Sequence, residues 1–400
     1  MSTEYQRALG RRIAQERKRR GLSQTELARL VDRSVAWISQ VERGVRKVDR
    51  MSVLEKVAET LDVPLSELAA EAPVIAATTE EAPGTAGLRL VLSGAHSLQA
   101  MLHATPVPAT AELKPRVDHA WELAHASRYV ELTDLLRGLV PMLENAVRSA
   151  PPERQPELFE LLAVTYQACS AALAKLGEPE AAWIAADRAI GAAERAGDPL
   201  MMAAGAFRLG FVFLGARHFD QAEETARTAA EALWFLTDQG KPEAMSLWGG
   251  LTLQRAVAAS RLNQADTAYQ HLARAREMAG RLGDGRNDYN TEFGPANVAL
   301  HEVAVAVEVG DAGHALRVGS AVDTSTLSGE RRARLNIDLA RAHAQRRQVD
   351  EAVAALLTAE AITPEQIHNH RVVRQLVSDL LAMQDPASSD LRGLADRVGA

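Results

Sequence analysis

The side chains best suited to hydrogen-bond chemistry lie in one short segment, residues 21–44, GLSQTELARLVDRSVAWISQVERG. The amide of Gln40 can pair with the edge of an adenine, and Ser34 and Ser39 can hydrogen-bond to base edges. The small apolar side chains of Val35 and Ala36 can pack on the methyl group of thymine. Whether these side chains meet such a partner depends on the elements that hold them.

Two short helices joined by a tight turn are predicted to hold these side chains. Ser23 and Glu26 have the spacing of a capping box at the start of the first of them, and Ser34 can cap the second. Asp32 lies in the turn, where aspartate tolerates a left-handed conformation. Apolar residues recur at helical spacing and predict five helices, at about 4–19, 23–31, 34–43, 51–61 and 64–70.

Charge is distributed unevenly along the chain. The 400 residues have a formal net charge of −7, yet residues 1–70 hold 14 Lys and Arg against 10 Asp and Glu. The remaining residues hold 31 Lys and Arg against 42 Asp and Glu. A basic N-terminal part is suited to approach phosphates, and the basic run 17–20 either adds to this attraction or is only a solvated face.

This N-terminal segment resembles the helix-turn-helix of the Cro and phage-repressor type, the XRE family. The resemblance covers roughly 65 residues and rests on the blocks QTELA and IS-x-x-E-x-G, with a departure at Asp32, where many members have glycine. It implies that the helix at 34–43 enters the major groove of double-stranded DNA. It also implies base reading by Ser34, Val35, Ala36, Ser39 and Gln40, and phosphate contacts by Gln24, Arg43, Arg46 and Lys47.

A change in composition separates this head from the rest of the chain. Residues 71–87, EAPVIAATTEEAPGTAG, are rich in Ala, Pro, Thr, Glu and Gly and lack periodicity. They predict a flexible linker, so that the head is oriented independently of the body or repositioned by it. The predicted domains are a DNA-binding head at 1–70, this linker, and a body at 88–400.

The body is predicted to be built from repeats. Similar helix starts with an acidic residue recur at spacings of 40, 46, 45 and 39 residues, at Glu180, Asp220, Asp266, Asp311 and Asp350. Each repeat predicts two antiparallel helices whose apolar face needs a neighbour, so the pairs are expected to stack as an α-solenoid in an all-α chain. Further helices are predicted at about 88–104, 111–126, 128–148, 364–384 and 388–398.

These repeats resemble tetratricopeptide repeats, although their period is longer than about 34 residues and no repeat has the full signature. The first helices of such pairs line a concave face. Polar or aromatic residues that interrupt apolar first helices are candidates for an effector groove, namely Arg208, Trp248, Gln254, Arg255, Asn297, His301 and Asn336. The alternative is that they only bridge neighbouring helices. The polar loop at 283–295 is either a lid over this face or simply exposed.

Few residues in the chain favour catalysis or metal binding. There is no glycine-rich phosphate loop, and His368 and His370 are two residues apart, which does not place them on one helical face. Cys169 is the only cysteine, which excludes an intramolecular disulfide and favours a reducing, cytoplasmic setting. We therefore predict no enzyme activity, no cofactor and no metal site. No stretch approaches the ~20 apolar residues of a membrane span, so no membrane partner is expected.

The combination of head and repeat body resembles actinobacterial XRE regulators and the RRNPP family of peptide-sensing regulators. It implies a cytoplasmic, nucleoid-associated transcription factor that binds a palindromic operator as a homodimer, with half-sites about one helical turn apart. The body would provide dimer contacts and bind a signalling peptide or a small molecule. The alternative is a DNA-localised scaffold whose body binds a protein partner. A polar, enclosed face favours the first hypothesis, and a flat apolar patch favours the second.

Overall fold

The computed structural model describes residues 3–46, 48, 51–64, 68, 85–93, 108–283, 285–384 and 386–400. All regular elements in these ranges are helices, which confirms the predicted all-α fold class. The chain forms two compact units. The first unit contains residues 1–80, 306–317 and 334–400, and the second contains residues 81–305 and 318–333.

The N-terminal helices of the first unit follow the predicted pattern. They are α1 (Thr3–Arg19), α2 (Gln24–Leu30), α3 (Val35–Glu42) and α4 (Met51–Leu61). The capping box is present, because the Ser23 hydroxyl accepts from the Glu26 amide and the Glu26 carboxylate accepts from the Ser23 amide. Ser34 caps α3 through the amide of Trp37. Asp32 has a φ of 53°, so the turn is left-handed there as predicted.

Two predicted boundaries near the linker change or fall outside the described residues. Of the predicted fifth helix at 64–70, only Pro64 and Leu68 are described, and residues 71–84 of the predicted linker are not. Helix α6 (Thr85–Val91) begins inside the predicted linker, so residues 85–87 are helical and the helix expected at 88–104 starts earlier. Residues 94–107 lie outside the described part.

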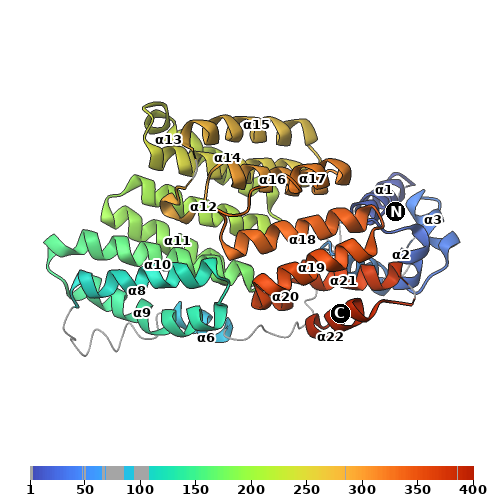
Figure 1. Cartoon of the computed structure of the whole chain (residues 1–400), viewed down its shortest axis with the longest axis horizontal. Helices are drawn as coiled ribbons and strands as arrows, with labels where there is room; N and C mark the ends of the chain where they lie inside the picture. The colour runs from blue at the N-terminus through green and yellow to red at the C-terminus, as the bar shows by residue number, and fades with distance from the viewer. Residues whose placement is uncertain are drawn as a thin grey trace. The chain divides into compact units, whose positions relative to one another are not determined.

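The second unit is a stack of antiparallel helix pairs (Figure 1). Its helices are α8 (Thr110–His125), α9 (Tyr129–Ser149), α10 (Gln155–Lys175), α11 (Pro179–Ala196), α12 (Pro199–Gly215), α13 (Phe219–Asp238), α14 (Pro242–Arg261) and α15 (Ala265–Leu282). Each packs on the next, and the first helices α8, α10, α12 and α14 also contact one another in that order. The stacking predicted from the repeats is confirmed for these helices.

Small residues allow the helices of the second unit to approach closely. Ala222 and Ala268, in the second helices α13 and α15, have no exposed surface. Gly249 in α14 is required by the Phe293 ring, because a Cβ at Gly249 would lie 2.1 Å from the ring atom Cζ. A ring packed this closely on the helix leaves no space for a larger side chain at Gly249.

The remaining helices complete both units. They are α16 (Pro295–Glu308), α17 (Ala312–Gly319), α18 (Gly329–Gln345), α19 (Val349–Ile362), α20 (Pro364–Asn369), α21 (Arg371–Met383) and α22 (Ser389–Val398). Helices α19–α22 contact one another within the first unit. Two short 3₁₀ turns, at Pro152–Arg154 and Asp288–Asn290, lie in the second unit.

Cys169 lies in α10 with no exposed surface, and burial raises the pKa of its thiol to about 12. A thiol with so high a pKa stays protonated at neutral pH and is a weak nucleophile. None of the helices in the described part of the chain is both long and apolar enough to cross a membrane.

Candidate nucleic-acid interface and polar cluster

The first turn of α3 presents its side chains to solvent. Ser34, Val35 and Ala36 are exposed, with Val35 at 41% of its full accessible surface, while Ser39 and Gln40 are half-buried. Trp37 and Ile38 of the same helix are buried in the head core. The helix therefore anchors its apolar face in the head and presents the residues predicted to read bases.

Arginines flank this surface. Arg33, Arg43 and Arg46 are all exposed. The Arg46 guanidinium lies 3.4 Å from the Gln40 amide oxygen, and the Arg43 side chain donates to the Ser39 carbonyl at 3.2 Å. Lys47, a predicted phosphate ligand, lies outside the described residues.

Gln24, another predicted phosphate ligand, is half-buried and hydrogen-bonded within the head. Its amide nitrogen donates to the Glu42 carboxylate at 2.8 Å. The same carboxylate accepts from Arg17 at 2.6 and 3.0 Å, and the Arg17 side chain is only 10% exposed. Arg17 is therefore a buried structural partner, and the prediction that the run 17–20 is a solvated face is wrong for this residue.

Arg20, at the other end of that run, joins the head to the C-terminal helices of the first unit. Its guanidinium forms a two-pronged ion pair with Asp379 in α21, one prong being Nε to Oδ2 at 2.7 Å. Burial raises the pKa of Asp379 to about 6, although the charge and hydrogen bonds of Arg20 act to lower it. The Arg29 side chain of α2 donates to the backbone carbonyl of Ala382, at the end of α21.

Helix α18 and the residues after it contact the start of α2. Arg347 forms a two-pronged ion pair with Glu26, the capping-box residue, with one N–O distance of 2.6 Å. Burial acts to raise the pKa of Glu26, but hydrogen bonds from Arg347 and Ser23 outweigh it and lower the pKa to about 2. Gly21 has a φ of 70°, and a Cβ there would lie 2.7 Å from the Ala344 carbonyl oxygen.

These contacts form what we call the head interface, defined by Arg20, Glu26, Arg29, Arg347 and Asp379. Its partners are separated by 321 to 359 residues in the sequence. Within the first unit these contacts hold the head on the C-terminal helices, whereas the linker composition predicts a head that is oriented independently of the body or repositioned by it. The start of α3 is exposed while the head is held in this way.

Two of the predicted groove residues hold one loop of the second unit. Arg208 in α12 donates to the carbonyls of Tyr289 and Asn290 at 2.9 and 2.8 Å, and its guanidinium lies 4.5 Å from the Trp121 ring centre. The Asn297 amide nitrogen donates to the carbonyls of Thr291 and Glu292 at 3.3 and 2.9 Å. The structure brings these two side chains to the same segment, as bridges to backbone groups.

The loop itself is packed rather than simply exposed. Thr291 and Phe293 are each 1% exposed. Tyr289, Asn290 and Glu292 have φ values of 50°, 55° and 51°. A left-handed conformation costs roughly 1–2 kcal/mol for a residue that is not glycine. The bonds from Arg208 and Asn297 hold the loop in this conformation.

The other predicted groove residues are dispersed. The Gln254 amide donates to the Phe207 carbonyl at 2.6 Å, Arg255 pairs with Glu223 at 2.9 Å, and Trp248 packs against Trp234 with ring centres 5.8 Å apart. His301 Nδ1 lies 2.8 Å from the Asn297 carbonyl. Asn336 is half-buried and belongs to the first unit, unlike the rest.

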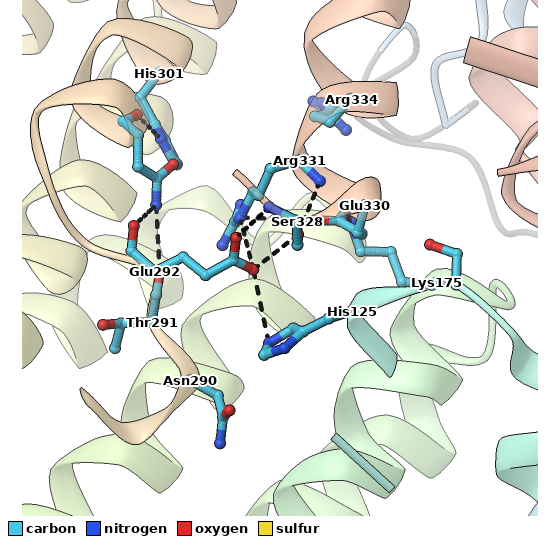
Figure 2. Close-up of polar contacts among 12 residues, drawn as sticks. His125, Lys175, Asn290, Thr291, Glu292, His301, Ser328, Glu330, Arg331 and Arg334 are labelled. Atoms are coloured by element: carbon cyan, nitrogen blue, oxygen red, sulfur yellow. Dashed lines mark hydrogen bonds and ion pairs between the residues drawn. The ribbon is translucent and has the colours of Figure 1, made fainter. Parts of the chain in front are cut away.

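A polar cluster that the sequence did not predict lies beside this loop. Figure 2 shows His125, Ser328 and Arg331 turned towards the Glu292 carboxylate. That carboxylate accepts from the Ser328 amide and hydroxyl at 3.1 and 3.0 Å. His125 Nε2 and Arg331 Nε lie 3.6 and 3.9 Å from Glu292 Oε1. Glu330, which is paired with Lys175, lies 3.6 Å from the same Arg331 nitrogen.

Burial and the neighbouring charges shift the pKa values of two side chains in and beside this polar cluster. Burial lowers the pKa of His125; Glu292 acts to raise it, and Arg208 and Arg331 act to lower it. Burial, together with the charge of Arg331, lowers the pKa of Arg208 to about 9, so Arg208 remains a cation at neutral pH. Within the described residues, no group of three or more His, Cys, Asp or Glu side chains is arranged to hold a metal ion.

Sequence reasoning missed His125, Glu292 and Ser328 because they come from three distant segments. The polar composition of the loop at 283–295 was the only local signal, and it pointed to a lid or an exposed loop. Nothing in the sequence near His125 or Ser328 marks them as neighbours of that loop.

Comparisons with known proteins agree with the geometry of the head. Residues 8–70 match the family model described as a helix-turn-helix domain. No curated protein matches the chain. Among solved structures, the chain is similar to PlcR of Bacillus thuringiensis, crystallised with the peptide PapR7 and DNA. Sequence identity is 14% and the TM-score is 0.34, over 78% of this chain and 95% of PlcR. A TM-score this low adds nothing to the assignment.

The described part of the chain combines a helix-turn-helix domain, matched over residues 8–70, with a body of stacked helix pairs. The family assignment applies to the matched residues 8–70, and the body is described by its own helices.

Proposed function

We propose that the chain is a sequence-specific transcriptional regulator. It binds double-stranded DNA through α3, with Ser34, Val35, Ala36, Ser39 and Gln40 at base edges. The observation that carries this proposal is the exposure of the first turn of α3 next to three exposed arginines, in a domain that matches the helix-turn-helix family. Exposed guanidinium groups on both sides of a helix suit phosphate contacts that set its register in the groove.

The finer proposal is that the protein binds a palindromic operator as a homodimer in the cytoplasm, on the nucleoid, and has no enzymatic role. Phosphate contacts come from Arg43, Arg46, Lys47 and Gln24. For Gln24 to contact a phosphate, its amide must either turn away from Glu42 or use its second N–H while the first still donates to Glu42. The body binds an effector, a peptide or a small molecule, that favours one arrangement of the two heads.

Footprinting of genomic DNA with the full chain tests this proposal. A protected site with two half-sites about one helical turn apart is expected. The matched variant is Arg46→Ala, which should weaken binding to all sequences and reduce the salt slope by about 1. Protection that is the same on random DNA would contradict sequence-specific recognition, and an unchanged salt slope would remove Arg46 from the phosphate contacts.

One observation favours the alternative function of a DNA-localised scaffold. Trp183 and Ile184 in α11 are each about half exposed, and Trp234 and Phe235 in α13 are 51% and 70% exposed. Exposed aromatic side chains are enriched at protein interfaces. Sedimentation of the double variant Trp183→Ser with Trp234→Ser distinguishes self-association from binding of a different protein. Loss of a dimer would assign these residues to self-association, whereas an unchanged dimer would leave them for a different protein partner.

A further inference from the structure

A cavity of about 330 Å³ lies beside the polar cluster of the second unit. It is lined by His125 at the end of α8, by the loop at 285–294, by the first residues of α16 and by residues 326–328. Ligand pockets in proteins start at about 300 Å³, so this cavity suits a small molecule and is too small for a folded partner. All its walls belong to the second unit.

Unpartnered acceptor and donor atoms remain in the walls. Asn297 is 2% exposed and lines the cavity. Its Nδ2 donates to two backbone carbonyls, which fixes the orientation of the amide. Its Oδ1 is buried and has no hydrogen-bond partner in the described part of the chain. His125 Nε2 is also buried without a hydrogen-bond partner, since Glu292 Oε1 lies 3.6 Å away, beyond hydrogen-bond distance. A buried polar atom without a partner costs about 1–3 kcal/mol.

The backbone around the cavity is also strained. Glu292, whose φ is 51°, lines the cavity, and Tyr289 and Asn290 precede it in the same conformation. Such conformations persist where the surroundings impose them, and they cluster at binding and catalytic sites. Hydrogen bonds from Arg208 and Asn297 hold this loop, and the Phe293 ring packs directly against Gly249 of α14.

The distribution of charge selects the kind of ligand. The start of α18 is where an anion would bind, but the Glu292 carboxylate already occupies it through Ser328. The nearby Arg286 guanidinium is paired with Asp288 at 2.8 Å and with Glu243 at 3.3 Å. The groups left for a ligand are the Asn297 oxygen and the remaining lone pairs of Glu292, which are acceptors, and His125 Nε2, which donates or accepts according to its tautomer. Phe293 and Leu327 add an apolar wall.

We propose that this cavity binds a small molecule that carries an ammonium or amide N–H donor next to a short apolar group. The donor is held by Asn297 Oδ1 and the Glu292 carboxylate, and the apolar group packs on Phe293 and Leu327. This assignment rests on the proposed function, in which the body binds an effector, and narrows the effector to an amine or amide of about the size of an amino acid. An anionic ligand would be repelled by Glu292.

Two probes of similar size and opposite charge test the chemical class. L-leucinamide carries an ammonium and an amide group, whereas N-acetyl-L-leucine carries a carboxylate. Calorimetry and thermal unfolding of the full chain are expected to show binding and a higher Tm with L-leucinamide only, because a ligand that binds the native state stabilises it. Preference for N-acetyl-L-leucine, equal effects of both probes, or no effect of either would overturn the proposal.

Variants at the mouth of the cavity locate the site. Thr326→Trp places a large ring at an exposed position that lines the cavity, and is expected to abolish the response to L-leucinamide. Ser325→Trp adds the same ring at the exposed neighbour, which does not line the cavity, and should retain the response. An unchanged response in Thr326→Trp, with the unliganded Tm equal to that of Ser325→Trp, would place the ligand elsewhere and overturn the assignment.

DNA binding is measured on the same samples so that the two proposals can fail separately. If L-leucinamide binds and operator affinity does not change, the cavity assignment is supported and the effector role of the proposed function is lost. If the operator is bound and L-leucinamide is not, the cavity assignment is overturned while DNA recognition stands.

Discussion

The head interface of the first unit and the polar cluster of the second unit are built from the same residue types but differ in how completely these are paired. At the head interface, Arg20 and Arg347 each contact one carboxylate through two nitrogens; one N–O distance is 2.7 Å for Arg20 and 2.6 Å for Arg347. In the polar cluster, His125 and Arg331 lie 3.6 and 3.9 Å from Glu292. The first arrangement is saturated and fastens two segments, whereas the second leaves atoms that can accept a partner.

Loss of an ion pair at the head interface should have the largest effect on the free energy of unfolding. Arg20→Met leaves Asp379 buried without its cation, and the loss of one partner of a buried pair costs about 3–5 kcal/mol. Urea unfolding of the full chain, followed by circular dichroism, measures this change. The double variant Arg20→Met with Asp379→Leu should recover most of the loss. A single variant within about 1 kcal/mol of the wild type would show that the pair contributes little, as exposed pairs do.

A change in the second unit should release the loop beside the polar cluster. Gly249→Ala puts a Cβ 2.1 Å from the Phe293 ring, and overpacking of this kind costs about 1–3 kcal/mol. Gly280→Ala in α15 is the matched control, since a Cβ there meets nothing within 4 Å and should stabilise the helix by about 0.5–1 kcal/mol. Thermal unfolding compares the two. Equal shifts in both variants would mean that Phe293 does not depend on Gly249.

A substitution on the exposed face of the head should affect DNA alone. Gln40→Ala is expected to weaken operator binding by about 1–3 kcal/mol and to relax specificity at one base position, with unchanged stability. Fluorescence anisotropy with operator and random duplexes measures both effects. An equal loss on random DNA would show that Gln40 contributes to general affinity and does not read a base.

The smallest effects concern pH, and they separate the two carboxylates of the head interface. Glu26 has its pKa lowered from 4.5 to about 2, so its contribution to stability is present above pH 4.5 and is lost as pH falls towards 2. Asp379 has its pKa raised from 3.8 to about 6, so its contribution is present below pH 3.8 and is lost as pH rises through 6.

Urea unfolding across this pH range tests the opposite signs. Relative to Asp379→Asn, the wild type should gain stability as pH falls from 7 to 4. Relative to Glu26→Gln, it should lose stability as pH falls below 4.5. If the stability of a variant changed with pH in parallel with that of the wild type, the substituted carboxylate would not contribute to the pH dependence.

The parts of the structure that depend on local spacing could be predicted. Ser23, Glu26 and Ser34 are three residues or fewer from the groups they cap, so the start of each helix is encoded nearby. The acidic residues Asp220 and Asp266 mark the first turns of α13 and α15, where a negative charge interacts favourably with the helix dipole. The stacking of helix pairs follows from the apolar faces that these starts define.

The contacts that join distant segments could not be predicted. Arg20 lies in a basic run that looks solvated, and its partner Asp379 is 359 residues away. The composition of the linker suggested independence, but it carries no information about which helices the head meets. Arg208 and Asn297 stood out as polar residues in apolar helices, yet the spacing of residues does not distinguish a ligand contact from a bridge to a loop carbonyl.

The buried position of Cys169 makes the chain convenient for labelling. The thiol has no exposed surface and stays protonated at neutral pH, so maleimide reagents should not react with it in the folded protein. A new cysteine at an exposed site, such as Val45 after α3, would then be the only reactive thiol in the otherwise native sequence. A fluorophore or spin label placed there could report the movement of the head onto DNA without the removal of any natural residue of the core.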